Sequence, residues 1–192
     1  MQPFSRRHDP EYACPMPAIA RLFDSLRQHR WLPVLLLVLG ALTPFALAPY
    51  NAWPVALVTI GLTGELLRGH TARRTAFLAW CHGFGLWAYG ASWLYVSIHD
   101  YGYTPPWLAT PMVGFVAGVM ALFFAGIGWL YARFRLDRAA LLALPALWVV
   151  GEWLRSWLFT GFPWLFTGYA FTGTPLAGYA PLLGVFGISL IV

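Results

Sequence analysis

The chain has 192 residues, of which 59% are apolar and 18% aromatic, and its 12 basic and 7 acidic side chains give a net charge of +5. Soluble domains carry roughly 25% charged residues, whereas this chain carries 10%, so a soluble globular domain and a disordered segment are both excluded. The mean hydropathy of +0.63 indicates a membrane protein.

Residues 1–30 are polar and contain several prolines, which is typical of an irregular lead. Within this lead, Ile19, Leu22, Phe23 and Leu26 recur at helical spacing beside charged residues, so a short amphipathic helix at the membrane surface is predicted. We expect this lead to be cytoplasmic.

Five apolar stretches follow, and each reaches or approaches the ~30 Å hydrocarbon core at about 1.5 Å per helical residue. A sixth stretch, at residues 182–192, would reach roughly half of that depth, so we expect the chain to continue beyond Val192 in a longer protein. The predicted fold is an all-α, polytopic membrane helix bundle of five spans plus a truncated sixth. The spans are expected at residues 31–48, 53–67, 75–98, 107–131, 139–157 and 182–192.

Residues 158–181 are apolar, but glycine and proline interrupt them too often for one helix. This pattern predicts an irregular interfacial or re-entrant loop, which must pack on protein because lipid cannot satisfy its backbone amides.

All twelve basic residues are arginine, and eleven of them lie in the lead or in the turns after the second and fourth spans. The positive-inside rule therefore predicts a cytoplasmic N-terminus and a periplasmic loop at 158–181. Because the arginines alternate with apolar segments, they do not form the continuous basic face that nucleic-acid binding requires.

Glu152 and Arg155 lie three residues apart on the fifth predicted span, so both side chains face the same side of the helix and can pair. Charges at membrane depth indicate function by default, but a structural clamp for the following loop explains this pair equally well. Cys81 and His82 are adjacent on one helix and diverge by about 100°, so they cannot form a catalytic dyad. The histidines match no metal-ligand spacing, and no metal or other cofactor is expected.

Small residues predict close helix packing at Gly83, Gly85 and Gly90, and at the GxxxG pair Gly114 and Gly118. Most of the eleven tryptophans fall at span ends, as anchoring residues do.

Thr160-Gly161-Phe162-Pro163-Trp164 joins a flexible glycine, a rigid proline and two large aromatic residues directly after the helix that carries Glu152. Such a segment can wall a cavity for an acyl chain or can simply anchor the loop, and composition does not choose between the two.

The run from Gly151 to Trp164, with Gly168-Tyr169, Pro175-Leu176 and Ala180-Pro181, resembles the signature of bacterial apolipoprotein N-acyltransferases. Phe45-Ala46-Leu47-Ala48-Pro49-Tyr50 with Trp53-Pro54 is similar to the first hairpin of that family. Gly83-Phe84-Gly85 with Trp93-Leu94-Tyr95-Val96-Ser97-Ile98 is similar to its third span.

The resemblance implies an inner-membrane enzyme with eight helices and a periplasmic nitrilase-like domain. Such an enzyme transfers an acyl chain from a phospholipid donor to the α-amine of the N-terminal cysteine of a diacylglyceryl apolipoprotein. The family's catalytic Glu, Lys and Cys belong to the nitrilase-like domain, so none is assigned to this chain.

What the resemblance carries to this sequence is a substrate entrance at Gly161, Phe162, Pro163 and Trp164, with Glu152 and Arg155 as its structural supports. The fragment alone is expected to position phospholipid without acyl transfer. The alternatives are a transporter or channel subunit that uses Glu152 and Arg155, or a membrane scaffold without a catalytic role.

Overall fold

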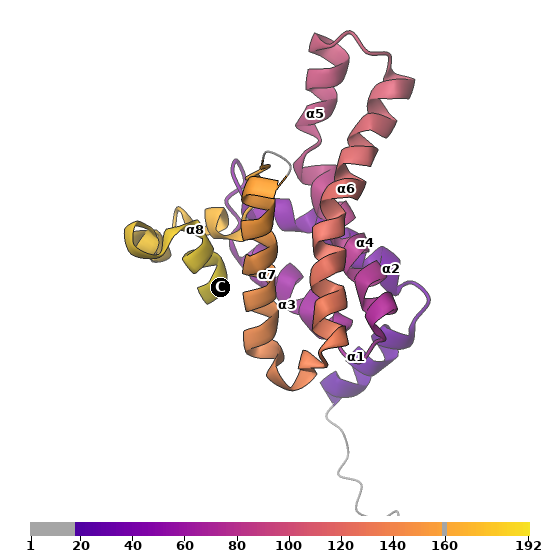
Figure 1. Cartoon of the computed structure of the whole chain (residues 1–192), viewed down its shortest axis with the longest axis vertical. Coiled ribbons are helices and arrows are strands. Elements are labelled where there is room, and N and C mark those ends of the chain that lie inside the picture. Colours follow the sequence, from indigo (N-terminus) through magenta and orange to yellow (C-terminus); the bar gives the residue numbers. More distant parts are fainter. Residues whose placement is uncertain (1–17, 159–160) are drawn as a thin grey trace, which may run out of the picture.

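The computed structural model describes residues 18–158 and 161–192, and in these two ranges every regular element is a helix. Figure 1 shows a bundle of helices from which one hairpin projects. The all-α class predicted from the sequence is confirmed. The helices are α1 Ala18–Gln28, α2 Leu32–Leu42, α3 Pro54–Leu67, α4 Ala72–Gly90, α5 Trp93–Val96, α6 Pro106–Arg133, α7 Ala140–Trp157 and α8 Ala180–Ile191, with the short turns η2 Thr43–Ala46, η3 Ser97–Tyr101, η4 Leu136–Ala139, η6 Thr167–Phe171 and η7 Pro175–Tyr179.

Two helical segments are long and apolar enough to cross a membrane, Pro106–Arg133 and Leu136–Trp157. A third candidate is the pair Ala20–Gln28 and Leu32–Ala46, which is bent by 108°. The fourth and fifth predicted spans therefore have the length and composition that crossing requires. The full count of five spans plus a partial sixth stays a prediction.

The predicted third span, 75–98, is not one continuous helix, because α4 ends at Gly90 and α5 begins at Trp93. Gly90 lies against the loop, where an added Cβ would come within 2.6 Å of the Leu165 side chain. The interruption between α4 and α5 therefore occurs where the loop approaches the end of α4. Gly90 and Leu165 are far apart in sequence.

Helix α4 occupies the centre of the bundle, between α2 and α6. Gly85 has no room for a side chain, because an added Cβ would meet the Leu37 carbonyl and lie 2.9 Å from the Ala41 nitrogen. Gly83 faces the Phe124 ring in the same way, so the predicted close packing at Gly83 and Gly85 is confirmed.

The packing predicted at Gly114 is wrong for the described chain, whereas Gly118 lies against α4, where its carbonyl accepts a hydrogen bond from the Trp80 indole at 3.1 Å. A Cβ at Gly114 would meet nothing within 4 Å, and one at Gly118 would meet only Trp80 at 3.7 Å. GxxxG spacing sets two glycines on one face of a helix, but it does not choose which face meets a neighbour.

The arginine-bearing segments meet at one end of the bundle. Arg27 of α1 donates to the carbonyl of Glu65 and forms an ion pair with its carboxylate. Arg68 donates to the Asp137 carbonyl at 3.4 Å, and the Tyr131 hydroxyl donates to the Asp137 carboxylate at 3.0 Å. These contacts connect α1, the α3–α4 turn and the α6–α7 turn.

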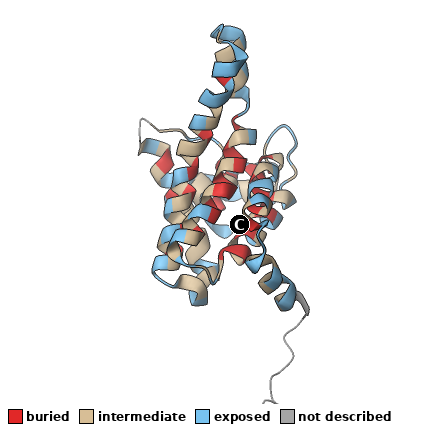
Figure 2. Cartoon of the chain, turned by 90° about the vertical axis from the view of Figure 1, so that its right-hand side faces the viewer, coloured by how far each residue is buried: buried red, intermediate tan, exposed pale blue. Residues whose placement is uncertain are grey.

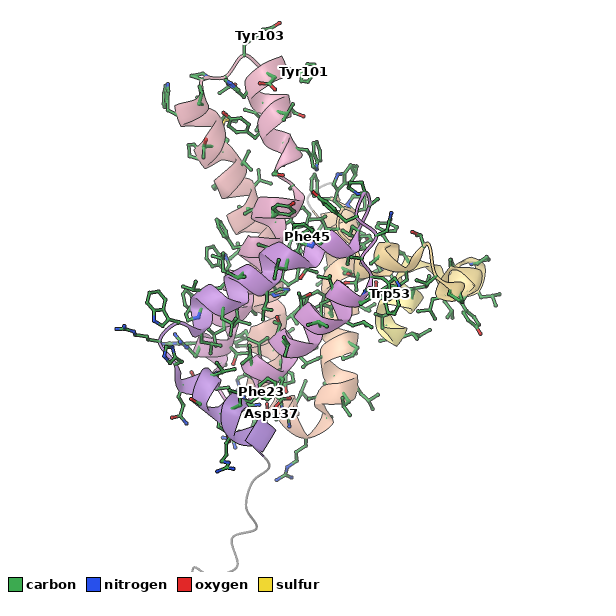
Figure 3. The ribbon with its side chains drawn as sticks, turned by 180° about the vertical axis from the view of Figure 1, so that it is seen from behind. Phe23, Phe45, Trp53, Tyr101, Tyr103 and Asp137 are labelled. Carbon is green, nitrogen blue, oxygen red and sulfur yellow. The ribbon has the colours of Figure 1, made fainter. Side chains whose placement is uncertain are left out.

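The opposite end carries the loop and the projecting hairpin of α5 and α6. Figure 3 shows Phe23 and Asp137 at one end of the molecule and Tyr101 and Tyr103 at the other. Helix α6 has 28 residues, which is about 42 Å at 1.5 Å per residue and exceeds the ~30 Å core. Buried residues gather in the bundle and the tip of the hairpin is exposed (Figure 2).

Candidate functional site at the α7 loop

Glu152 is a buried acid on α7 whose carboxylate connects the helix to the loop. Its side chain is 4% exposed. Its Oε1 accepts hydrogen bonds from the Thr167 backbone N–H at 2.7 Å and from the Trp148 indole N–H at 3.2 Å. The same indole N–H also lies 2.9 Å from the Thr167 hydroxyl. Since a charged acceptor forms a strong hydrogen bond in a dry environment, these contacts fix the start of η6 against α7.

Arg155 lies one helical turn further along and is 2% exposed. Its guanidinium carbon is 5.0 Å from the Trp87 ring centroid, 5.1 Å from that of Phe166 and 5.9 Å from that of Phe124. Rings at this range attract a cation by roughly 0.5–2 kcal/mol each, and more strongly where water is excluded. The aromatic cage, made of Trp87, Phe124 and Phe166, therefore stabilises a charge at membrane depth.

The expected direct pairing of Glu152 and Arg155 is wrong. No ion pair of 4.0 Å or less joins the two side chains among the residues that the structure describes. The reason is geometric, because the loop amide and Trp148 bind the carboxylate while three rings on other elements surround the guanidinium.

The loop leaves α7 through a turn that requires glycine. Gly161 has a φ of +82°, and a Cβ there would collide with the Ser156 carbonyl, so both the backbone conformation and the space demand glycine. The next residue, Phe162, donates its backbone N–H to the Arg155 carbonyl at 2.9 Å. The chain is thereby folded back over the last turn of α7.

Phe162 and Trp164 form an aromatic corner on the bundle. The Phe162 ring lies 5.2 Å from Trp87 and 5.4 Å from Trp164, centroid to centroid. Trp164 in turn lies 6.1 Å from Trp93 of α5 and remains 43% exposed. Pro163 between them is exposed. The corner thus has a buried base on α4 and an outer surface made by two tryptophans.

The loop is also attached to α8. Gly168 donates its backbone N–H to the Ser189 hydroxyl at 2.8 Å, and a Cβ at Gly168 would collide with the Val185 carbonyl. The irregular segment therefore contacts α4, α7 and α8, as expected of irregular backbone at membrane depth.

A cavity of about 390 Å³ is lined by residues of α3, α4, α6, α7 and α8 together with Thr167 of the loop, and Gly161, Phe162, Pro163 and Trp164 do not line it. His82 borders it, buried, with its Nδ1 2.9 Å from the Thr63 hydroxyl. In residues 18–158 and 161–192, no three His, Cys, Asp or Glu side chains come together as a metal site.

Sequence reasoning missed Trp148, Thr167 and the aromatic cage. Trp148 stands four residues before Glu152 on the same helical face, so helical spacing could have found it. Trp87 and Phe124 belong to other helices, and no local pattern places them beside Arg155.

A family model described as the apolipoprotein N-acyltransferase N-terminal domain matches residues 39–192. The chain belongs to the apolipoprotein N-acyltransferase family. It is similar to the apolipoprotein N-acyltransferase of Pseudomonas paraeruginosa, with 49% identity over 164 residues that cover 83% of this chain and 32% of that protein.

Similarity extends to other bacteria. The apolipoprotein N-acyltransferase of Coxiella burnetii is 46% identical over 163 residues, which are 83% of this chain and 34% of the relative. That of Vibrio cholerae is 38% identical over 173 residues, or 88% and 34%. The chain spans about a third of the length of these curated relatives, and the apolar helices fit a bacterial membrane protein of this family.

Proposed function

We propose that this chain is the membrane portion of an enzyme that transfers an acyl chain from a phospholipid to the N-terminal cysteine amine of a diacylglyceryl apolipoprotein. Membership of the family, over residues 39–192, carries this proposal. The enzyme acts in the bacterial inner membrane, with the N-terminus in the cytoplasm and the loop in the periplasm. This chain contributes no catalytic residue.

The role we assign to residues 31–192 is positioning of the phospholipid donor. Acyl chains held against the helices keep the donor ester close to the reacting nucleophile, and such positioning can lower a barrier by several kcal/mol. The aromatic corner at Gly161–Trp164 is the substrate entrance in this proposal. Its outer surface, made by Trp93 and Trp164, supports contact with lipid.

The test is acyl transfer by the full-length enzyme from a phospholipid to a diacylglyceryl peptide. Trp164→Ala removes the exposed ring of the corner and leaves the backbone, so we expect kcat/KM for the phospholipid to fall about tenfold, which corresponds to ~1.4 kcal/mol. Membrane insertion and the amount of folded protein should stay at the wild-type level.

Trp157→Ala is the matched control, because Trp157 is 51% exposed at the same end of the bundle and lies outside the corner. Equal, small effects of both substitutions would mean that Trp164 only anchors the loop. Normal acylation by Trp164→Ala would disprove the substrate entrance at the aromatic corner. If the wild-type enzyme acylated no peptide, the proposed acyltransferase activity would be disproved.

A further inference from the structure

Three polar atoms at the base of the loop have no protein partner among the described residues. They are Glu152 Oε2 and the Nε and Nη2 of Arg155, and all three are buried. A buried donor or acceptor without a partner costs roughly 1–3 kcal/mol, and more for a charged group. Native structures satisfy such atoms with few exceptions, so these three together call for a ligand.

A small cavity is lined by both of these side chains. Its volume is about 10 Å³, and its walls come from α6 and α7. Both charged side chains that line it are more than nine-tenths buried. A space of about 10–15 Å³ is enough for one water molecule, and a polar wall is what keeps such a molecule in place. The lining residues are Phe123, Phe124, Ile127, Trp148, Gly151, Glu152 and Arg155.

We propose that this cavity is a binding site for a single water molecule that bridges Glu152 and Arg155. Water has two O–H donors and two acceptor lone pairs. It donates to Glu152 Oε2 and accepts from the Nε–H and Nη2–H of Arg155, so one molecule satisfies all three atoms. Glu152 and Arg155 therefore form an ion pair that is mediated by this water molecule.

Other occupants fit the chemistry less well. A metal cation would face the guanidinium, and an anion would face the carboxylate. An apolar group would leave all three polar atoms unsatisfied. Only a small neutral molecule that both donates and accepts hydrogen bonds matches both side chains at once.

The bridge explains how two opposite charges stabilise each other without touching. Glu152 keeps its Oε1 for the Thr167 amide and for Trp148, while Arg155 stays inside the aromatic cage. The water links the two through the atoms that remain. It thus joins the hydrogen-bonded and the aromatic supports of the loop into one unit.

The direct test is an experimental map of the wild-type full-length protein at a resolution that shows ordered water. We expect one isolated density peak about 2.6–3.2 Å from Glu152 Oε2 and from a guanidinium nitrogen of Arg155. A direct contact between the carboxylate and the guanidinium, or a resolved cavity without a peak, would overturn the proposal. This measurement needs no variant.

A second test uses the coupling between the two side chains. Glu152→Gln, Arg155→Met and the double variant form a double-mutant cycle, read as shifts of the thermal unfolding midpoint of the full-length protein. The cycle should show a nonzero coupling. In a Gly151→Ala background the new methyl group meets the Ile127 side chain and narrows the cavity, so the coupling should shrink.

Gly126→Ala on α6 is the matched control, since a Cβ there would meet nothing within 4 Å and the coupling should stay at its wild-type value. A coupling that is equal in the Gly151→Ala and Gly126→Ala backgrounds would contradict a bridging water. If Gly151→Ala does not fold, the map of the wild-type protein decides.

Discussion

Glu152 is a buried residue whose carboxylate attaches the loop to α7. Its carboxylate accepts hydrogen bonds from the backbone amide of Thr167 in the loop and from the indole of Trp148 on α7. The partner of this carboxylate is a backbone N–H, which is present whatever side chain stands at residue 167. Residue 152 must therefore always supply an acceptor. The consequence is that an acceptor atom at this position matters more than a charge.

This distinction gives a prediction for Glu152→Gln and Glu152→Ala. Glutamine retains an amide oxygen that can accept from Thr167, while alanine leaves the Thr167 N–H without its acceptor at roughly 1–3 kcal/mol; the Trp148 indole keeps the Thr167 hydroxyl as its partner. We expect the unfolding midpoint of the full-length protein in detergent to fall much further for alanine than for glutamine.

Asp100→Ala serves as the control, because the Asp100 side chain is 57% exposed and lies outside the loop contacts. It should leave the midpoint close to the wild-type value. Equal losses for the two Glu152 variants would show that the charge, and not the acceptor, stabilises the loop.

Sequence alone predicted which charges lie within an apolar helix, since Glu152 and Arg155 stand out in a run with few other polar side chains. It also predicted a flexible glycine at Gly161, directly after this helix. The cage around Arg155 comes from Trp87, Phe124 and Phe166, which are distant in sequence, and pattern reasoning has no access to such contacts.

Glycines on α4 allow the neighbouring helices to approach it closely. Gly85 lets the backbones of α2 and α4 approach closely, because its missing side chain leaves room for the Leu37 carbonyl. Close approach of helices through small residues is a general feature of packing in membranes, where the lipid provides no hydrophobic force between helices.

Gly85→Ala should therefore destabilise the bundle. The methyl group would meet backbone atoms that cannot move by rotamer change, and overpacking of this kind typically costs about 1–3 kcal/mol. The expected result is a lower unfolding midpoint and less folded protein in detergent. Gly114→Ala is the control, since nothing in the described chain lies within 4 Å of a Cβ there. Indistinguishable midpoints for the two variants would argue against the backbone contact.

Helix positions along the chain were predictable because proline, glycine and arginine mark their ends. Pro44 is the second residue of η2, which directly follows α2, and Pro54 is the first residue of α3. The break between α4 and α5 was not predictable, since it accompanies contact with the loop around Leu165, which lies 75 residues further along (165 − 90). Likewise, helical periodicity cannot tell that Gly85, and not Gly114, faces another backbone.

The whole molecule has two chemically different ends. Arginines of α1, of the α3–α4 turn and of the α6–α7 turn gather at one end, where hydrogen bonds connect these segments. The tip of the α5–α6 hairpin lies at the other end (Figure 3), and the aromatic corner lies beside Trp93, the first residue of α5. Sequence predicted this polarity from the arginines alone, but it gave no sign that the hairpin would rise beyond the bundle.

We propose that the Gly161–Trp164 corner and the arginine-rich turns lie on opposite sides of the inner membrane. The most direct measurement is labelling of single cysteines with a membrane-impermeant maleimide in spheroplasts, using an otherwise cysteine-free full-length protein. Trp164→Cys should react in intact spheroplasts, and Arg135→Cys, in the α6–α7 turn, should react only after lysis. Labelling of Arg135→Cys in intact spheroplasts, or of Trp164→Cys only after lysis, would show that the two segments do not have this orientation.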